Sequence, residues 1–93
     1  MSVYVDNARN RFGRMVMCHM MADTAEELHA MAQRIGMRRE WFQGDHYDVS
    51  LTRKEDARRR GAIEVTTRAM VAIRRRFRHR QAAAKAIAEG IAT

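Results

Sequence analysis

Residues 15–36, MVMCHMMADTAEELHAMAQRIG, carry the clearest structural signal in the chain. Residues 15–22 form an apolar run interrupted by His19, and this run has the length of a buried strand. Asp23 then begins an Asp-x-x-Glu pattern that is typical of a helix N-terminus. Apolar residues follow at helical spacing and Gly36 is the expected C′ residue, the apolar set being Leu28, Met31, Ala32 and Ile35. A buried strand that leads directly into an amphipathic helix predicts an α/β fold.

Shorter signals on both sides of this segment predict the other strands. Val3-Tyr4-Val5 is β-branched and aromatic, which favours a strand that ends at Asp6. Residues 7–14 contain turn-prone asparagine and glycine and are predicted to be a loop. Residues 46–50 and 62–65 each predict a further short strand. We expect parallel pairing at least where a helix separates two strands.

Two more helices are predicted in the second half of the chain. Thr52-x-x-Glu55 marks the start of a short, charged helix that Gly61 stops, and Thr66 or Thr67 caps a last helix. The chain contains no proline, so this helix can continue through the alanine-rich residues 82–88. One face repeats at intervals of three and four residues, with Met70, Ile73, Phe77, Arg80, Ala84, Ile87 and Ile91. This spacing fits an amphipathic helix on its own sheet, or one that pairs with a second copy in a homodimer.

The predicted fold class is therefore α/β, with a small single-layer sheet of about four strands, at least partly parallel, and three helices, the last one long and basic. Residues 1–74 are expected to form a compact domain and residues 75–93 a basic, alanine-rich helical extension. The 93 residues of the chain suit one domain. Cys18 is the single cysteine, which excludes an internal disulfide and a cysteine-based zinc site. We expect a cytoplasmic protein with no membrane partner, since the sequence shows neither a signal peptide nor a membrane span.

The basic charge of the chain is concentrated at its C-terminal end. The formal net charge is +7, and residues 74–93 carry six basic side chains against Glu89 alone, a net charge of +5. Nucleic acid or another polyanion is the partner that such a segment would attract. The competing interpretation is a solvated charged face, because sixteen of the eighteen basic residues are arginine, and this excess can reflect genome composition.

Six short motifs together resemble a known family of small bacterial and phage proteins, grouped as domain of unknown function 4031. The motifs are Val3-Tyr4-Val5-Asp6, His19-Met20-Met21-Ala22-Asp23-Thr24, Glu27-Leu28-His29-Ala30, Trp41-Phe42-Gln43, His46-Tyr47-Asp48 and Gly61-Ala62-Ile63-Glu64-Val65. The resemblance covers residues 3–74 approximately and implies an intracellular or phage-encoded protein. It implies no activity, and it does not extend to the basic segment from Arg75 onward.

Candidate functional residues lie on the predicted strands and in the predicted loop after the first strand. Asp6, His19, His46 and Asp48 offer imidazole and carboxylate groups for a divalent metal ion, and His19, His46 and Asp48 are also candidates for acid–base catalysis. Candidate ligand-binding residues are Arg9, Arg11, Arg14, His19 and His46, because an arginine guanidinium suits phosphate oxygens. Structural explanations compete with these roles: Asp6 is also explained as a turn former, and His19 as a hydrogen-bonded histidine near the core.

Three functions stay open on the sequence. The favoured hypothesis is a non-enzymatic binding module for a phosphate-bearing ligand, a nucleotide or nucleic acid, that uses the arginines of residues 7–14 and the His/Asp edge. The first alternative is a small metal-dependent phosphoester hydrolase with Asp6, His19, His46 and Asp48 as ligands. The second alternative is a phage or bacterial regulatory protein that binds another protein. The enzyme hypothesis requires these four side chains to converge in space.

Overall fold

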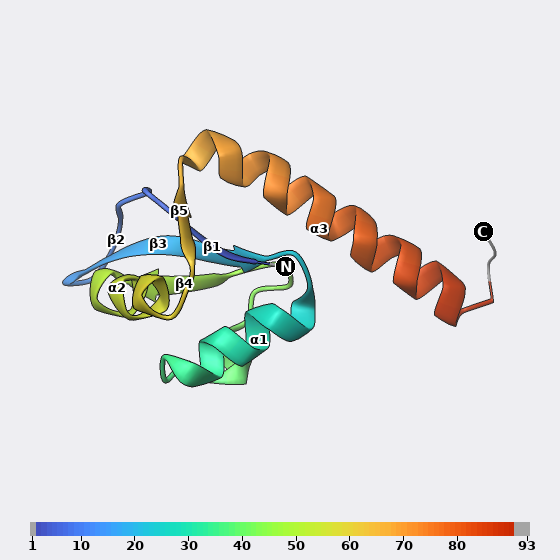
Figure 1. Ribbon diagram of the computed structural model, residues 1–93, viewed down its shortest axis with the longest axis horizontal. Helices are drawn as coiled ribbons and strands as arrows, with labels where there is room; N and C mark the ends of the chain where they lie inside the picture. Colours follow the sequence, from blue (N-terminus) through green and yellow to red (C-terminus); the bar gives the residue numbers. More distant parts are fainter. Residues whose placement is uncertain (1, 91–93) are drawn as a thin grey trace.

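The computed structural model describes residues 2–90 and consists of a five-stranded mixed sheet with helices on both faces (Figure 1). The strands are β1 Val3–Asp6, β2 Asn10–Phe12, β3 Met15–Ala22, β4 Tyr47–Ser50 and β5 Ile63–Val65. The helices are α1 Ala25–Arg34, α2 Leu51–Arg59 and α3 Thr67–Ala88, and a short 3-10 helix, η1, spans Arg39–Trp41. The predicted fold class, with a partly parallel sheet and a long last helix, is confirmed.

Strand β3 is the centre of the sheet. Strands β2 and β1 both pair antiparallel with the same edge of β3. Strand β2 pairs with the first part of β3, with Asn10 opposite Met17, and β1 pairs with its last part, with Val5 opposite Met20. Strand β4 pairs antiparallel with the other edge, and β5 pairs parallel with β1. Among residues 2–90, parallel pairing is therefore confined to β1 and β5. The expectation of parallel strands around α1 is wrong, because residues 36–46 lead the chain back to the end of β3 before β4 begins.

Part of the predicted loop at residues 7–14 is a strand. The hairpin between β2 and β3 closes through Gly13 and Arg14, with Phe12 paired to Met15. Gly13 has a φ of 63° and the structure shows no positive φ at any described non-glycine residue, so this two-residue turn has the type II′ pattern. A glycine at the first turn position is the sequence signal for this hairpin. The sheet consequently has one strand more than predicted.

The two faces of the sheet are covered by different helices (Figure 1). Alternate strand residues such as Val5, Met20 and Val49 point to one face and pack with α1 and α2 in the larger core. On the opposite face, Met21 packs against Met70, Ile73 and Phe77 of α3 in a smaller cluster. Because α3 contacts only part of its face, polar strand residues next to this cluster stay accessible.

Two of the predicted helix caps lie one or two residues from their true positions. Thr24, not Asp23, caps α1, and its Oγ1 accepts a hydrogen bond from the Glu27 backbone amide at 3.3 Å. Asp23 instead accepts hydrogen bonds from the Ser2 amide and the Tyr4 hydroxyl. Ser50 rather than Thr52 caps α2, and Thr66 caps α3 as one of the two predicted alternatives. Both corrections arise because a neighbouring hydroxyl reaches the third amide of the helix.

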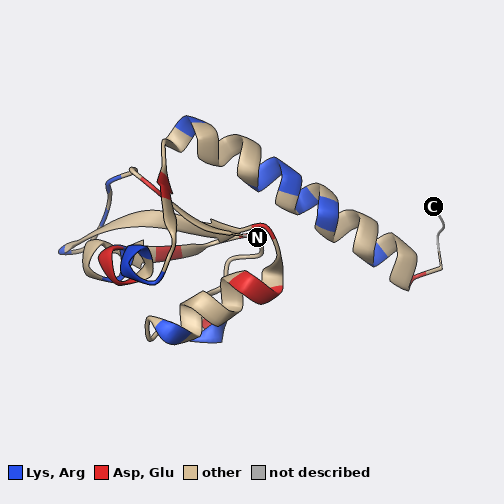
Figure 2. Cartoon of the chain, viewed as in Figure 1, with Lys and Arg blue, Asp and Glu red and all other residues tan. Residues whose placement is uncertain are grey.

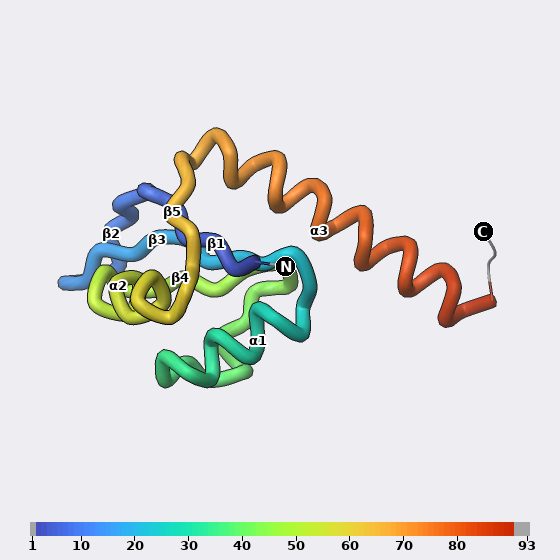
Figure 3. Tube along the Cα trace, viewed as in Figure 1, coloured from blue at the N-terminus to red at the C-terminus, as the bar shows by residue number. Residues whose placement is uncertain are grey.

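Helix α3 is continuous and runs outward from the sheet (Figure 3). Its buried residues end at Phe77, which is 2% exposed, so the packed part of the chain reaches beyond the predicted boundary at residue 74. Arg80 still donates a hydrogen bond to the Asp23 carbonyl. Ile87 is 70% exposed, and Ile91 of the predicted seam lies outside the described residues. Within residues 2–90, none of the helices has the length and apolarity that spanning a membrane requires.

Candidate metal centre

The four predicted polar residues converge on the sheet face that α3 partly covers. Asp6, His19 and Asp48 come from β1, β3 and β4, and the strand register places His19 directly opposite Asp48. His46 lies just before β4, two residues from Asp48, and so shares its face. The two imidazole ring centroids are 5.3 Å apart in an edge-to-face arrangement. The four side chains therefore lie close together, as the hypothesis of a metal-dependent hydrolase requires.

Each imidazole is held from behind by a carboxylate. His19 Nδ1 lies 2.7 Å from Asp6 Oδ2, and His46 Nδ1 lies 2.6 Å from Asp45 Oδ1. The two Nε2 atoms therefore face forward, toward Asp48. Asp48 Oδ1 lies 3.4 Å from His46 Nε2 and 4.0 Å from His19 Nε2. The Gln43 side-chain amide donates a hydrogen bond to the other Asp48 oxygen at 2.7 Å, which orients that carboxylate.

For a neutral imidazole, these contacts place the ring proton on Nδ1. A carboxylate only accepts hydrogen bonds, so each neutral imidazole donates its Nδ1–H to the carboxylate behind it. The Nε2 lone pairs of His19 and His46 then point at the same space as the lone pairs of Asp48 Oδ1. Three acceptors that face one another without a proton between them repel unless a cation lies among them. Metal-bound histidines are oriented by carboxylates in this way.

The spacing of the three acceptors suits a small divalent ion. Histidine nitrogens and carboxylate oxygens bind Zn²⁺ at about 2.0–2.2 Å, which puts tetrahedral ligands about 3.4 Å apart. The three ligand atoms of His19, His46 and Asp48 lie within 4.8 Å of one another. The half-exposed Asp48 side chain can close the remaining distance by a small rotation. Two imidazoles and one carboxylate leave further coordination positions open for water or substrate.

Asp6 lies behind the site and is not free to bind an ion directly. Its Oδ1 accepts hydrogen bonds from the backbone amides of Ala8 and His19, and its Oδ2 is bonded to the His19 ring. The residue is 1% exposed. Asp6 therefore orients His19, while the predicted ligands His19, His46 and Asp48 line the site itself.

Asp45 is a site residue that the sequence analysis missed. It is 4% exposed, and besides His46 it contacts Arg74 Nε at 2.6 Å and Arg78 Nε at 2.8 Å. Burial alone would raise the pKa of Asp45, but the hydrogen bonds from His46, Arg74 and Arg78 outweigh it and lower the pKa to about 2. The available sequence signals were an aspartate directly before a candidate histidine and two arginines four residues apart on one helix face.

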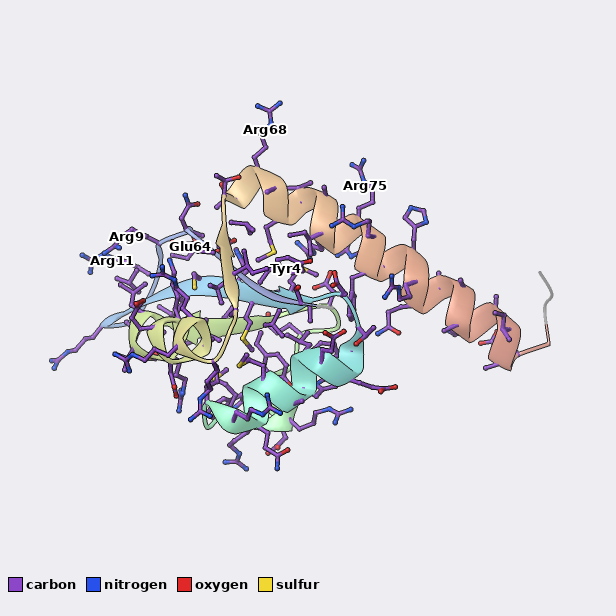
Figure 4. All side chains as sticks on the ribbon, in the orientation of Figure 1. Tyr4, Arg9, Arg11, Glu64, Arg68 and Arg75 are labelled. Atoms are coloured by element: carbon purple, nitrogen blue, oxygen red, sulfur yellow. The ribbon has the colours of Figure 1, made fainter. Side chains whose placement is uncertain are left out.

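A cleft of about 610 Å³ opens beside the three acceptors, between the β2–β3 hairpin and η1. Arg11, Phe12 and Trp41 line it together with His19, His46 and Asp48. Figure 4 shows Arg9 and Arg11 extending into solvent from the edge that carries β2. Of the three predicted arginines, which are all exposed, Arg11 lines this cleft, and Arg9 and Arg14 are not among the residues that line it.

His29 and Cys18 lie on the opposite face of the sheet, away from this site. His29 Nδ1 lies 2.7 Å from the buried Tyr47 hydroxyl, and burial followed by the charge of Arg39 lowers the pKa of His29. Cys18 is fully buried in the larger core, which raises the pKa of its thiol to about 11. Cys18 therefore belongs to the core, whereas His29 is partly exposed at its edge.

Comparison with known proteins identifies a family but no characterised relative. The sequence family described as "Protein of unknown function (DUF4031)" matches residues 3–77. This range includes every residue of the candidate metal centre and ends at Phe77, the last buried residue of α3. No curated protein and no solved structure matches the chain.

Proposed function

The chain belongs to the family described as "Protein of unknown function (DUF4031)", and we propose that it is a small metal-dependent phosphoester hydrolase. The observation that carries the proposal is the orientation of His19, His46 and Asp48, whose Nε2 and Oδ1 atoms face one space. Asp6 and Asp45 hold the two imidazoles as the carboxylates of metal sites do. We propose that the protein acts in the cytoplasm, because nucleotides and nucleic acids are phosphate esters that are present there.

The proposed reaction is hydrolysis. A bound divalent ion such as Zn²⁺ or Mn²⁺ would act as a Lewis acid on a phosphoryl oxygen and lower the pKa of a coordinated water. Water adds its oxygen to phosphorus, the phosphorus–oxygen bond to the leaving group breaks, and the leaving oxygen receives the proton that water loses. Arg11, which is exposed and lines the cleft, supplies a guanidinium for a nonbridging phosphate oxygen.

Metal binding is the first test of this function. Isothermal titration with Zn²⁺ and with Mn²⁺ should give one site per chain, and His46→Ala and Asp48→Asn should each weaken it at least tenfold. His79→Ala is the matched control, because His79 is exposed on α3 and is not among the three acceptors. The metal-loaded protein should hydrolyse bis(p-nitrophenyl) phosphate, and the same two variants should lose this activity.

A non-enzymatic phosphate-binding module is the second candidate, and the exposed position of Arg11 at the cleft favours it. This function requires binding of a phosphate ligand that Arg11→Ala weakens, with no turnover in either Zn²⁺ or Mn²⁺. Stoichiometric metal binding with turnover excludes it. Absence of metal binding at micromolar concentrations contradicts the hydrolase.

A further inference from the structure

We infer that the substrate of this site is single-stranded nucleic acid, with a strand that passes from the β2–β3 hairpin over the metal centre to the outer face of α3. The inference rests on the proposed function, because it names the substrate class of the same site. Three features carry it: the row of adjoining hollows, the aromatic side chains at one end, and the basic side chains at the other.

Hollows that adjoin one another lie on both sides of the metal centre. The cleft of about 610 Å³ shares His19 and His46 with a smaller cavity of about 200 Å³ between the sheet and α3. This cavity in turn shares Val71 and Arg74 with a depression on the exposed face of α3. The three hollows therefore adjoin one another in a row, called the path below, and the metal centre lies where its first and second parts meet. A path that continues on both sides of the reactive position suits a polymer better than a terminal phosphate.

The end of the path at the hairpin carries exposed aromatic rings. Phe12 is 71% exposed and Trp41 is 41% exposed, and both line the cleft next to the metal centre. The Arg53 guanidinium lies 5.5 Å from the Trp41 ring centre and supports that ring. Exposed aromatic rings beside a cationic surface bind unpaired bases by stacking, whatever the base. A duplex keeps its base faces covered, so this end favours a single strand.

The other end of the path is basic. Between Thr67 and Ala88, α3 carries seven arginine and lysine residues and no acidic residue, and Figure 2 shows most of them together along the helix. Asp45 binds two of them, Arg74 and Arg78. Arg75 lines the depression on α3, and Figure 4 shows it and Arg68 pointing away from the sheet. Such side chains bind a phosphate backbone with an affinity that falls as the salt concentration rises.

Strand binding is measured by fluorescence anisotropy with a labelled 20-nucleotide single strand, the duplex of the same length, and heparin as a competing polyanion. EDTA is present to prevent cleavage. The single strand should bind more tightly than the duplex. Phe12→Ala should weaken it about tenfold, which is the effect expected for the loss of one stacked base. Arg75→Ala should reduce the slope of log affinity against log salt by about one.

Two matched controls test whether these effects belong to the path. Ile87→Ala removes an apolar side chain as exposed as Phe12, at 70%, from the far part of α3. Arg59→Ala removes an exposed arginine from α2, on the opposite face of the sheet. Both variants should bind the strand like the wild-type protein. Equal affinity for duplex and single strand, displacement by heparin with no effect of Phe12→Ala, or no binding at all would overturn the inference.

The same proteins separate this inference from the proposed function. Hydrolysis of bis(p-nitrophenyl) phosphate reports the metal centre alone, because that substrate is too small to extend along α3. If this hydrolysis occurs and strand binding fails, the substrate class is wrong and the hydrolase stands. The strand can also bind as described while neither bis(p-nitrophenyl) phosphate nor the strand is hydrolysed in Zn²⁺ or Mn²⁺. In that case the proposed hydrolase is wrong, and single-stranded nucleic acid is a ligand of the protein and not its substrate.

Discussion

Asp6 orients the ring of His19 through one hydrogen bond. Asp6→Asn keeps the shape of the side chain, and its amide oxygen can still accept from the Ala8 and His19 backbone amides. The new amide group donates to His19 Nδ1, so the ring proton moves to Nε2 and blocks the lone pair that faces Asp48. We expect Zn²⁺ affinity to fall about 10–100-fold.

Isothermal titration measures this fall, and circular dichroism confirms that the variant is folded. Asp56→Asn on α2 is the control, since Asp56 pairs with Arg60 far from the metal centre. A normal Zn²⁺ affinity in Asp6→Asn would show that the Nδ1 contact does not orient the ring for metal binding.

At the scale of elements, Asp45 holds α3 against the loop before β4. The pKa of Asp45 is lowered to about 2, below its usual value of 3.8, so the folded state favours the ionised form. This contribution to the free energy of unfolding is present above about pH 4 and is lost as the pH falls toward 2, a change on the order of 2 kcal/mol. Asp45→Asn should remove this contribution to the pH dependence and reduce stability at pH 7 by a similar amount.

Urea unfolding of the two proteins at pH 7, 4 and 2.5 measures the difference between them. Asp48→Asn serves as the control, because Asp48 is half-exposed and makes no contact with an arginine among the ion pairs of the described residues. Parallel pH profiles for the wild-type and Asp45→Asn proteins would contradict the role assigned to Asp45.

The arrangement of the elements explains which residues of the metal centre could be predicted from the sequence. Convergence of Asp6, His19, His46 and Asp48 was predictable in part, because alternation along strands places residues two apart on one face. The register that sets His19 opposite Asp48 was not predictable, since it depends on the return of residues 36–46 to the end of β3. Asp45 was missed because its partners lie 29 and 33 residues away, on α3.

At the scale of the whole molecule, the packed part of the chain extends to Phe77, beyond the predicted boundary at residue 74. A chain that ends at residue 74 loses Phe77, which is 2% exposed, and Arg78, which binds Asp45. Removal of a buried phenylalanine side chain costs about 3–5 kcal/mol. A chain that ends at residue 81 keeps both contacts. We expect a marked loss of thermal stability in the shorter chain and little change in the longer one.

Differential scanning calorimetry of both truncated chains and the full chain gives this comparison directly. The longer truncated chain acts as the control for loss of helix length, because it removes exposed alanine-rich residues without touching the packed clusters. Equal melting temperatures for the two truncated chains would mean that the second core cluster adds nothing to stability.

Asp45 belongs to two structures at once, since one oxygen binds the ring of His46 and the other binds α3. Events at these two places are thermodynamically linked, and the coupling free energy is the same in both directions. If a cation on His46 makes the attachment of α3 tighter, a polyanion that draws Arg74 and Arg78 away must weaken the hold on the cation by an equal factor. Under that condition, binding of a polyanion to α3 and binding of a cation at the metal centre change each other's affinity by the same factor.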